Sequence, residues 1–171
     1  MISSRLTTRY CSKSASGATA LDGHGAVWIE ANGAAVTING TISVNAARGG
    51  GSGGGSGGSV FLTYQDLRAS VSARLYANGG NSGAAGMNPS GAGGGGRIAV
   101  WIGTVTEAQR RTLFADGIIP RAVIGSTSSK YQGIVSATNG INTSYPSGNG
   151  LSGTVVFIVI PASAGTMISI R

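Results

Sequence analysis

Short runs in which apolar and polar residues alternate recur along the whole chain. The clearest are AVWIE (26–30), SVFLT (59–63), RIAVWI (97–102) and TVVFIVI (154–160). They are rich in β-branched and aromatic residues, which favour strands over helices. Successive side chains of a strand point to opposite faces, so Val27 and Ile29 are expected to be buried while Trp28 faces outward. The pattern therefore predicts an all-β chain whose strands each have one buried face.

The alternating runs are spaced as repeats. Val27 aligns with Val60 at an offset of 33 residues, and in a second pair of strands, within 41–46 and 73–78, Ile42 aligns with Leu75 at the same offset. One short strand cannot bury its apolar face alone, but equivalent strands stacked on each other build a continuous core. The repeat therefore predicts a right-handed parallel β-helix in which each coil contributes a first strand and a later second strand.

About four coils fit into the chain, by the spacing of the strands. The remaining first strands are assigned to 97–102 and 154–160, and the remaining second strands to 133–140 and 166–170. The N-terminal run at 4–10 is expected to be a second strand that lacks its first strand. A short third side is predicted between the two strands of a coil, where Ile38 falls on Val71 at the offset of 33.

Glycine-rich segments occupy the same position in every repeat. Most of the 31 glycines lie after a second strand and before the next first strand, at 14–25, 46–58, 78–96 and 139–153. In a β-helix this position places the segments on one edge, stacked on each other. Glycine lets backbones approach closely, so we expect the segments to be partly ordered, packed side by side as extended strands similar to polyproline II. The alternative is a set of mobile linkers.

The composition allows a packed core. Apolar residues make up 41% of the chain and charged residues 10%, whereas a disordered chain needs low hydrophobicity and high charge. The length suits a single domain, residues 1–171, or a fragment of a longer repeat protein. No run reaches the roughly 18 apolar residues that cross a membrane, so no membrane span is expected. The N-terminal residues also lack the apolar segment of a signal peptide.

One segment departs from the repeat. Residues 103–132 replace the expected short link between the first and second strands of the third coil. Thr106 has the character of a helix N-cap, and 107–115 suits a short helix that ends near Gly117. The segment is expected to be either an anion-binding outgrowth or a solvated amphipathic helix that covers an apolar patch. Its positive charge is concentrated on Arg110, Arg111, Arg121 and Lys130.

Three stretches of the chain carry a resemblance to a known kind of repeat. GGGSGGSVFLTYQDL, SARLYANGG and GGGGRIAVWIG together resemble the glycine-rich repetitive β-helical segments of bacterial secreted or surface proteins, which are adhesin-like. The resemblance covers residues 25–102 well and 133–160 loosely, and the positions that carry it are 56–62, 77–80 and 94–99. It implies an extracellular or cell-surface location and indicates no particular activity.

Charge and outward aromatic residues indicate which ligands suit the chain. The net charge of +7 favours anionic partners, such as an acidic glycan or a cell-surface polysaccharide. No nucleic-acid-binding module is recognised, so no specific nucleic-acid partner is predicted. Outward aromatic residues would stack on sugar rings, dock another protein layer or lie under the glycine loops. The residues expected in this group are Trp28, Phe61, Tyr64 and Tyr76.

The residues that catalysis requires are sparse. His24 and Cys11 are each the only residue of their type, so we predict neither a zinc site nor a histidine-based triad, and no metal or cofactor. A polysaccharide-cleaving enzyme would need two carboxylates that face one cleft. Glu30 falls opposite Thr63 in the repeat and Asp66 follows three residues later, which makes Glu30 and Asp66 the candidate pair.

These observations favour a non-catalytic structural or adhesive module of an extracellular surface protein or filament. Its partners are expected to be adjacent coils of a longer chain or other copies that stack end to end, because an open β-helix end is an unpaired edge. Two alternatives stay open at this point. One is a glycan- or receptor-binding β-helix of the kind found at phage tips, and the other is a polysaccharide-cleaving β-helix.

Overall fold

The strands form two sheets on either side of one core. A computed structural model describes residues 6–11, 25–49, 53–83, 90–103, 123–142 and 148–160. Within these residues the chain consists of β-strands and extended segments, without an α-helix. The expected all-β class is therefore confirmed. The predicted helix at 107–115 lies outside the described residues.

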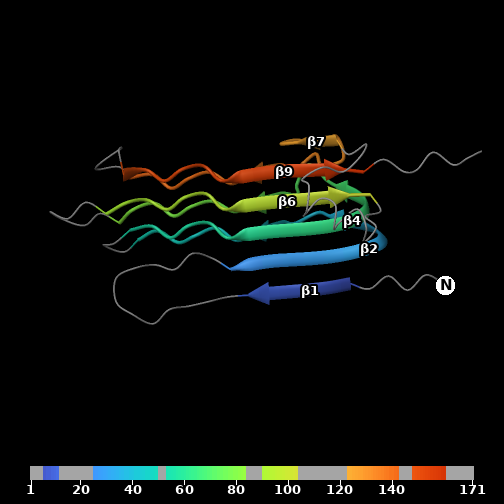
Figure 1. The fold of residues 1–171 in the computed structure, drawn as a ribbon, viewed down its shortest axis with the longest axis horizontal. Coiled ribbons are helices and arrows are strands. Elements are labelled where there is room, and N and C mark those ends of the chain that lie inside the picture. The colour runs from blue at the N-terminus through green and yellow to red at the C-terminus, as the bar shows by residue number, and fades with distance from the viewer. Residues whose placement is uncertain are drawn as a thin grey trace, which may run out of the picture.

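The larger sheet has six strands in the order β1, β2, β4, β6, β9, β7 (Figure 1). Their bounds are β1 Leu6–Cys11, β2 Ala26–Ile38, β4 Ser59–Ala69, β6 Arg97–Ile102, β9 Thr154–Val159 and β7 Val123–Gly125. β2, β4, β6 and β9 are parallel, with Val27 paired to Val60 and Ile98 paired to Val155. The predicted alignment of Val27 with Val60 is confirmed, as are the two later first strands.

The smaller sheet is also parallel and has three strands, in the order β3, β5, β8. Their bounds are β3 Thr41–Ser43, β5 Arg74–Tyr76 and β8 Ile134–Ser136. Ile42 pairs with Leu75, and Leu75 pairs with Val135. The second strands predicted for the first three repeats are therefore confirmed. The one predicted at 166–170 lies outside the described residues.

The core lies between the two sheets and is filled by alternate residues of the parallel strands. Val60, Leu62 and Tyr64 of β4 are at most 1% exposed, and Leu75 of the smaller sheet is 0% exposed. All four belong to one apolar cluster that draws on both sheets. Burial of each large apolar side chain contributes roughly 1.5–3 kcal/mol. A short strand buries only a few such side chains, so the core depends on the stacking of neighbouring strands.

The link between the sheets has a different register from the one predicted. Pairing between β2 and β4 is interrupted after Ala31 and resumes at Ala35, because β4 has fewer residues than β2 in this bend. Ile38 therefore lies beside Ala69, and its predicted alignment with Val71 is wrong. Val71 is instead 72% exposed, in the turn that precedes β5.

Antiparallel strands lie along both edges of the larger sheet. β1 pairs with residues 26–31 of β2. The N-terminal run is thus a strand of the larger sheet, and its predicted place among the second strands is wrong. At the other edge, β7 comes from the 103–132 segment and pairs with residues 157–159 of β9. Alternation fixes which residues of a strand are buried, but it fixes neither the partner nor the direction of an edge strand.

Beyond the strands, the chain continues as extended glycine-rich segments on one side of the sheets (Figure 1). The segments that follow the smaller sheet, here called the outward segments, are 44–49, 77–83 and 137–142. The segments that lead into the larger sheet, here called the return segments, are 53–58, 90–96 and 148–153. Together they form the glycine array. Figure 1 shows the return segments running nearly in line with β4, β6 and β9.

Backbone hydrogen bonds join the segments of the glycine array at every third residue. Within the return set, the amides of Gly54 and Gly57 donate to the next return segment at 3.0 and 2.9 Å. Between the two sets, the amides of Gly93 and Gly96 donate to the outward segment 77–83 at 2.9 and 2.7 Å. A period of three is that of the polyproline II helix, which makes no hydrogen bonds within its own strand. The expectation of ordered side-by-side packing is therefore confirmed for the described residues.

The glycine array leaves no room for a side chain where its segments touch. An added Cβ at Gly93 would lie 1.8 Å from the carbonyl oxygen of Gly55, and one at Gly96 would lie 1.9 Å from that of Gly58. Both obstacles are backbone atoms, which cannot rotate away. A Cβ at Gly91 would meet nothing closer than 3.7 Å. Glycine is thus required at particular contacts of the array and not along its whole length.

Candidate binding surfaces

A strip of aromatic rings crosses the outer face of the larger sheet, on the side away from the core. The ring centroids of Trp28 and Phe61 lie 4.7 Å apart with planes tilted by 54°, and those of Phe61 and Trp101 lie 6.3 Å apart with planes tilted by 53°. Pairs at such separations stabilise by about 0.5–1.5 kcal/mol beyond their burial. We call these three residues the aromatic strip. Its exposure falls along its length, from 40% at Trp28 to 5% at Trp101.

Trp101 is the member of the aromatic strip that the sequence pattern did not predict. The register places Ala99 opposite Phe61 and Trp101 opposite Thr63. Because Ala99 is small, the nearest large side chain to Phe61 on β6 is the indole of Trp101, which lies diagonally across the two strands. Aromatic side chains are long enough to contact diagonal neighbours in sheets. Ile158 of β9 is also buried and packs in the same cluster. The buried end of the strip at Trp101 is therefore part of a second, smaller apolar cluster, against which Phe61 packs.

The two tyrosines expected among the outward aromatic residues do not join the aromatic strip. Tyr64 shares a face with Val60 and Leu62, because alternate residues of a strand point the same way, and it is 1% exposed in the core. The prediction that Tyr64 points outward is therefore wrong. Tyr76 lies in the smaller sheet, on β5, and is half-buried. Among the predicted aromatic residues, the structure brings together Trp28 and Phe61.

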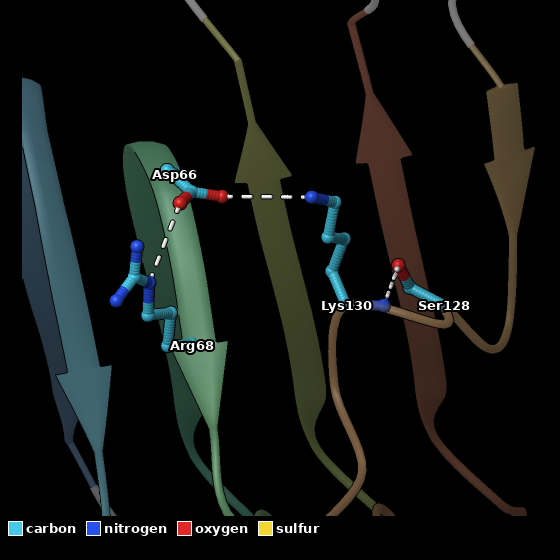
Figure 2. Close-up of polar contacts among 4 residues, drawn as sticks. All are labelled: Asp66, Arg68, Ser128 and Lys130. Atoms are coloured by element: carbon cyan, nitrogen blue, oxygen red, sulfur yellow. Dashed lines mark hydrogen bonds and ion pairs between the residues drawn. The ribbon is translucent and has the colours of Figure 1, made fainter.

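A polar groove of about 550 Å³ lies where the larger sheet bends toward the smaller one. Its polar lining consists of Thr37, Asn39, Asp66, Arg68, Ser70, Ser129, Lys130 and Gln132. Asp66 connects two of its walls (Figure 2). One carboxylate oxygen lies 3.7 Å from Arg68 Nε, on the same strand, and the other lies 3.7 Å from Lys130 Nζ, on the loop before β8. We call this surface the polar groove.

Lys130 is the predicted cation that the structure places in the polar groove. Its backbone amide donates to Ser128 Oγ at 3.3 Å, within a turn that orients the loop (Figure 2). The next residue, Tyr131, forms a parallel bridge with Ala69 and so returns the chain to the ladder beside β4. The other predicted cations lie outside the described residues. They are Arg110, Arg111 and Arg121.

The pKa values of two tyrosine hydroxyls are raised because these groups are buried. Burial, reinforced by the neighbouring Tyr131, raises the pKa of Tyr64 above its ordinary value of 10. Burial also raises the pKa of Tyr131 to about 12, although Arg74 acts in the opposite direction. The Tyr131 ring packs on Phe157 with centroids 5.7 Å apart. Both hydroxyls therefore stay protonated at neutral pH and bring no charge into the core.

Asparagine side chains mark the seam between the smaller sheet and the glycine array. Asn45 Oδ1 accepts a hydrogen bond from the amide of Asn78 at 2.7 Å. Asn78 Oδ1 accepts from the amide and the hydroxyl of Thr138, at 2.9 and 3.1 Å, and from the hydroxyl of Ser136 at 2.6 Å. Each carbonyl thus ties one level of the seam to the next. The seam binds the end of the sheet to the start of the array.

The two candidate acids lie apart in the register. Glu30 pairs with Thr63, as expected, but Asp66 pairs with Ala35, beyond the interruption in the ladder. Asp66 is also engaged by two cations in the polar groove. In the part of the chain that the structure describes, no three potential metal ligands gather into a group. Nor does that part contain a helix with the length and apolar character to span a membrane.

The chain matches no protein-family model, no curated protein and no solved structure at a significant level.

Proposed function

We propose that this chain is a non-catalytic structural or adhesive module of an extracellular surface protein or filament. Its strands are proposed to wind as a right-handed parallel β-helix of about four coils, with the glycine-rich segments on one edge. Support comes from the order of the parallel strands, because the chain alternates between the larger and the smaller sheet from β2 to β3, β4, β5 and β6, and after the edge strand β7 it passes to β8 and then to β9. A chain that moves up one strand at each pass follows the path of a solenoid.

The glycine array is the observation that carries the proposal. Catalytic and ligand-gating loops need freedom to move, whereas the described parts of these segments are hydrogen-bonded to each other at every third residue. Contacts such as that between Gly93 and Gly55 leave no space for a single methyl group. Segments packed in this way are held at fixed spacings by backbone contacts, which suits a spacer or a rigid adhesive surface.

The sheet edges limit how copies of the chain would stack. Among the described strands, β1 and β7 lie along the edges of the larger sheet and β3 and β8 along those of the smaller sheet, so a second copy is proposed to pair with one of these four. Edge strands with free backbone groups add strands from other chains. Assembly between copies is therefore proposed to start at these strands, and adjacent coils of a longer chain would meet the same edges.

Adhesion and assembly are tested on the same protein. Beads coated with the purified chain are expected to adhere to bacterial cells or to polysaccharide-coated surfaces, or the chain is expected to form larger particles as its concentration rises, followed by light scattering. The Gly93→Ala variant should lose this behaviour, and the Gly91→Ala variant should keep it. A chain that neither adheres nor assembles at any concentration would overturn the proposal.

A polysaccharide-cleaving β-helix is the competing proposal for this chain. It would require Glu30 and Asp66 to act on one glycosidic bond. Incubation with a panel of polysaccharides and detection of new reducing ends provides the test. Cleavage that disappears in both Glu30→Gln and Asp66→Asn would replace the structural proposal with an enzymatic one.

A further inference from the structure

We propose that the polar groove binds a short acidic oligosaccharide. The groove is separate from the glycine array, so this inference goes beyond the structural role proposed above. It rests on a row of polar side chains from β2, β4 and the loop before β8, and on two cations that share the carboxylate of Asp66.

Polar side chains line the groove as a row across neighbouring strands. Thr37 pairs with Arg68 in the register, and the adjacent bridge between Ala69 and Tyr131 sets Lys130 level with Arg68. Ala69 and Tyr131 are buried, so the residues beside them on each strand face outward into the groove. Neighbouring strands are about 4.8 Å apart, which is close to the length of one sugar residue in an extended glycan. Each level of the row therefore suits one sugar.

Two cations share one carboxylate in the groove, which leaves donors for a ligand. Asp66 lies 3.7 Å from both Arg68 Nε and Lys130 Nζ, whereas a strong charge-assisted hydrogen bond is about 2.7–2.9 Å long. The guanidinium and the ammonium groups carry several N–H donors each, so most of them are unused by Asp66. The three charges sum to one net positive charge, which favours an anionic ligand group such as the carboxylate of a uronic acid.

The remaining lining residues match the hydroxyl groups of sugars. Hydroxyl and amide side chains both donate and accept hydrogen bonds, as sugar hydroxyls do. These residues are Thr37, Asn39, Ser70, Ser129 and Gln132. Among the described residues of the lining there is no aromatic ring on which a nucleic-acid base would stack. An acidic oligosaccharide thus fits the groove better than a single-stranded nucleic acid does.

Binding is tested by titration calorimetry of the full chain at low salt. The probe is a short oligogalacturonate, and its methyl ester serves as the matched neutral ligand with the same backbone. We expect the acid to bind and the ester to bind at least about tenfold more weakly, because the ester cannot form the charged hydrogen bonds. Arg68→Gln and Lys130→Gln should each weaken binding of the acid by about fivefold. Asp66→Asn should strengthen it, because Asp66 competes with the ligand carboxylate for the same cations.

Arg97→Gln is the control for net charge, because Arg97 is exposed at the start of β6 and lies outside the groove lining. It should leave the affinity unchanged. The proposal is overturned if the chain binds neither probe, if acid and ester bind equally, or if Arg97→Gln weakens binding as much as Arg68→Gln does. Tighter binding of a single-stranded oligonucleotide, lost in Arg68→Gln, would also overturn it. Thermal unfolding of each variant verifies that the exposed substitutions leave the chain folded.

Discussion

The core between the sheets and the glycine array hold neighbouring strands together by opposite means. In the core, Leu62 and Leu75 are 0% exposed, and large side chains fill the space between backbones. In the array, the backbones themselves touch, and Gly93 and Gly96 face the carbonyl groups of their neighbours. The core thus depends on the volume that side chains supply, whereas the array depends on their absence.

This difference implies that the two regions differ in stability as well as in packing. Apolar burial contributes most of the stability of a folded domain, and a hydrogen bond contributes only about 1 kcal/mol in net terms. The array has many hydrogen bonds and little apolar area between its segments. It should therefore open locally more often than the strands do.

The largest expected effect follows from removal of volume in the core. Leu62→Ala leaves a cavity between the sheets, and we expect the free energy of unfolding to fall by about 2–5 kcal/mol. Urea denaturation followed by far-ultraviolet circular dichroism measures the change. Leu151→Ala is the matched control, because Leu151 is 84% exposed. Equal effects of the two variants would show that the stacked strands do not hold the chain together.

A smaller and more local effect is expected when volume is added to the array. Gly93→Ala places a methyl group within 1.8 Å of the Gly55 carbonyl oxygen, so the segments must separate. We expect a loss of about 1–3 kcal/mol, as for other overpacked sites. The bond from the Gly140 amide to the Gly93 carbonyl should open, and hydrogen exchange at Gly140 reports it directly. Amides of β4 should keep their protection.

Gly91→Ala provides the matched control, two residues away in the same segment. Its Cβ would meet nothing closer than 3.7 Å, and alanine restricts the unfolded chain more than glycine does. This variant should be neutral or slightly more stable. If both alanine variants lose stability equally, the array is limited by backbone conformation rather than by close contact. If Gly93→Ala exposes the β4 amides as well, the two regions form one cooperative unit.

The parts of the fold that follow from the sequence are those that depend on local alternation and on the repeat. Val27 and Val60 pair at the predicted offset, and so do Ile42 and Leu75. The third side does not follow the repeat, because the bend of β4 is shorter than that of β2 and brings Ala69 beside Ile38. No pattern of apolar residues reveals a shortened bend between two strands.

The candidate sites were predictable to a smaller extent for the same reason. Alternation along β2 predicts the outward position of Trp28. The same alternation along β4 places Tyr64 inside, on the face of Val60 and Leu62. Trp101 joins the strip through a diagonal contact that depends on the offset between β4 and β6. The contact between Asp66 and Lys130 depends on where the 103–132 segment rejoins the ladder. Contacts of this kind are set by tertiary register and not by sequence spacing.

Alkaline pH is expected to destabilise the core before the glycine array, with an effect on the free energy of unfolding that is smaller than that of Leu62→Ala. The pKa of an unfolded tyrosine is about 10, whereas burial raises the pKa of Tyr131 in the folded chain to about 12. Between these values the folded state keeps a proton that the unfolded state has released. Stability therefore falls as pH rises, by at most about 1.4 kcal/mol per pH unit for each tyrosine. The described array segments contain no tyrosine, so the loss should begin in the core.

Tyr131→Phe tests the origin of this alkaline loss. Phenylalanine keeps the ring that packs on Phe157 but has no proton to release. Urea denaturation from about pH 9 to about pH 12 should show a shallower decline for the variant than for the parent chain. An unchanged slope would assign the alkaline loss to other groups. If a rise in pH reduces the protection of array amides more than that of β4 amides, relative to their protection at neutral pH, high pH opens the array first.

The smallest expected effect lies at the seam, where the two regions meet. Asn78→Ala removes the carbonyl that accepts from Thr138 and Ser136, and we expect a loss of about 1 kcal/mol, since water replaces part of these bonds. Asn78→Asp keeps the acceptor oxygen and should retain most of the stability at neutral pH. Hydrogen exchange at the Thr138 amide measures the local change, and equal behaviour of the two variants would contradict the role of the acceptor.

If the seam couples sheet to array, Asn78→Ala should also speed exchange at Gly140, because Thr138 and Gly140 lie on the same outward segment and both bond to a neighbouring level. Faster exchange at Thr138 alone would mean that the array is held by its own backbone contacts.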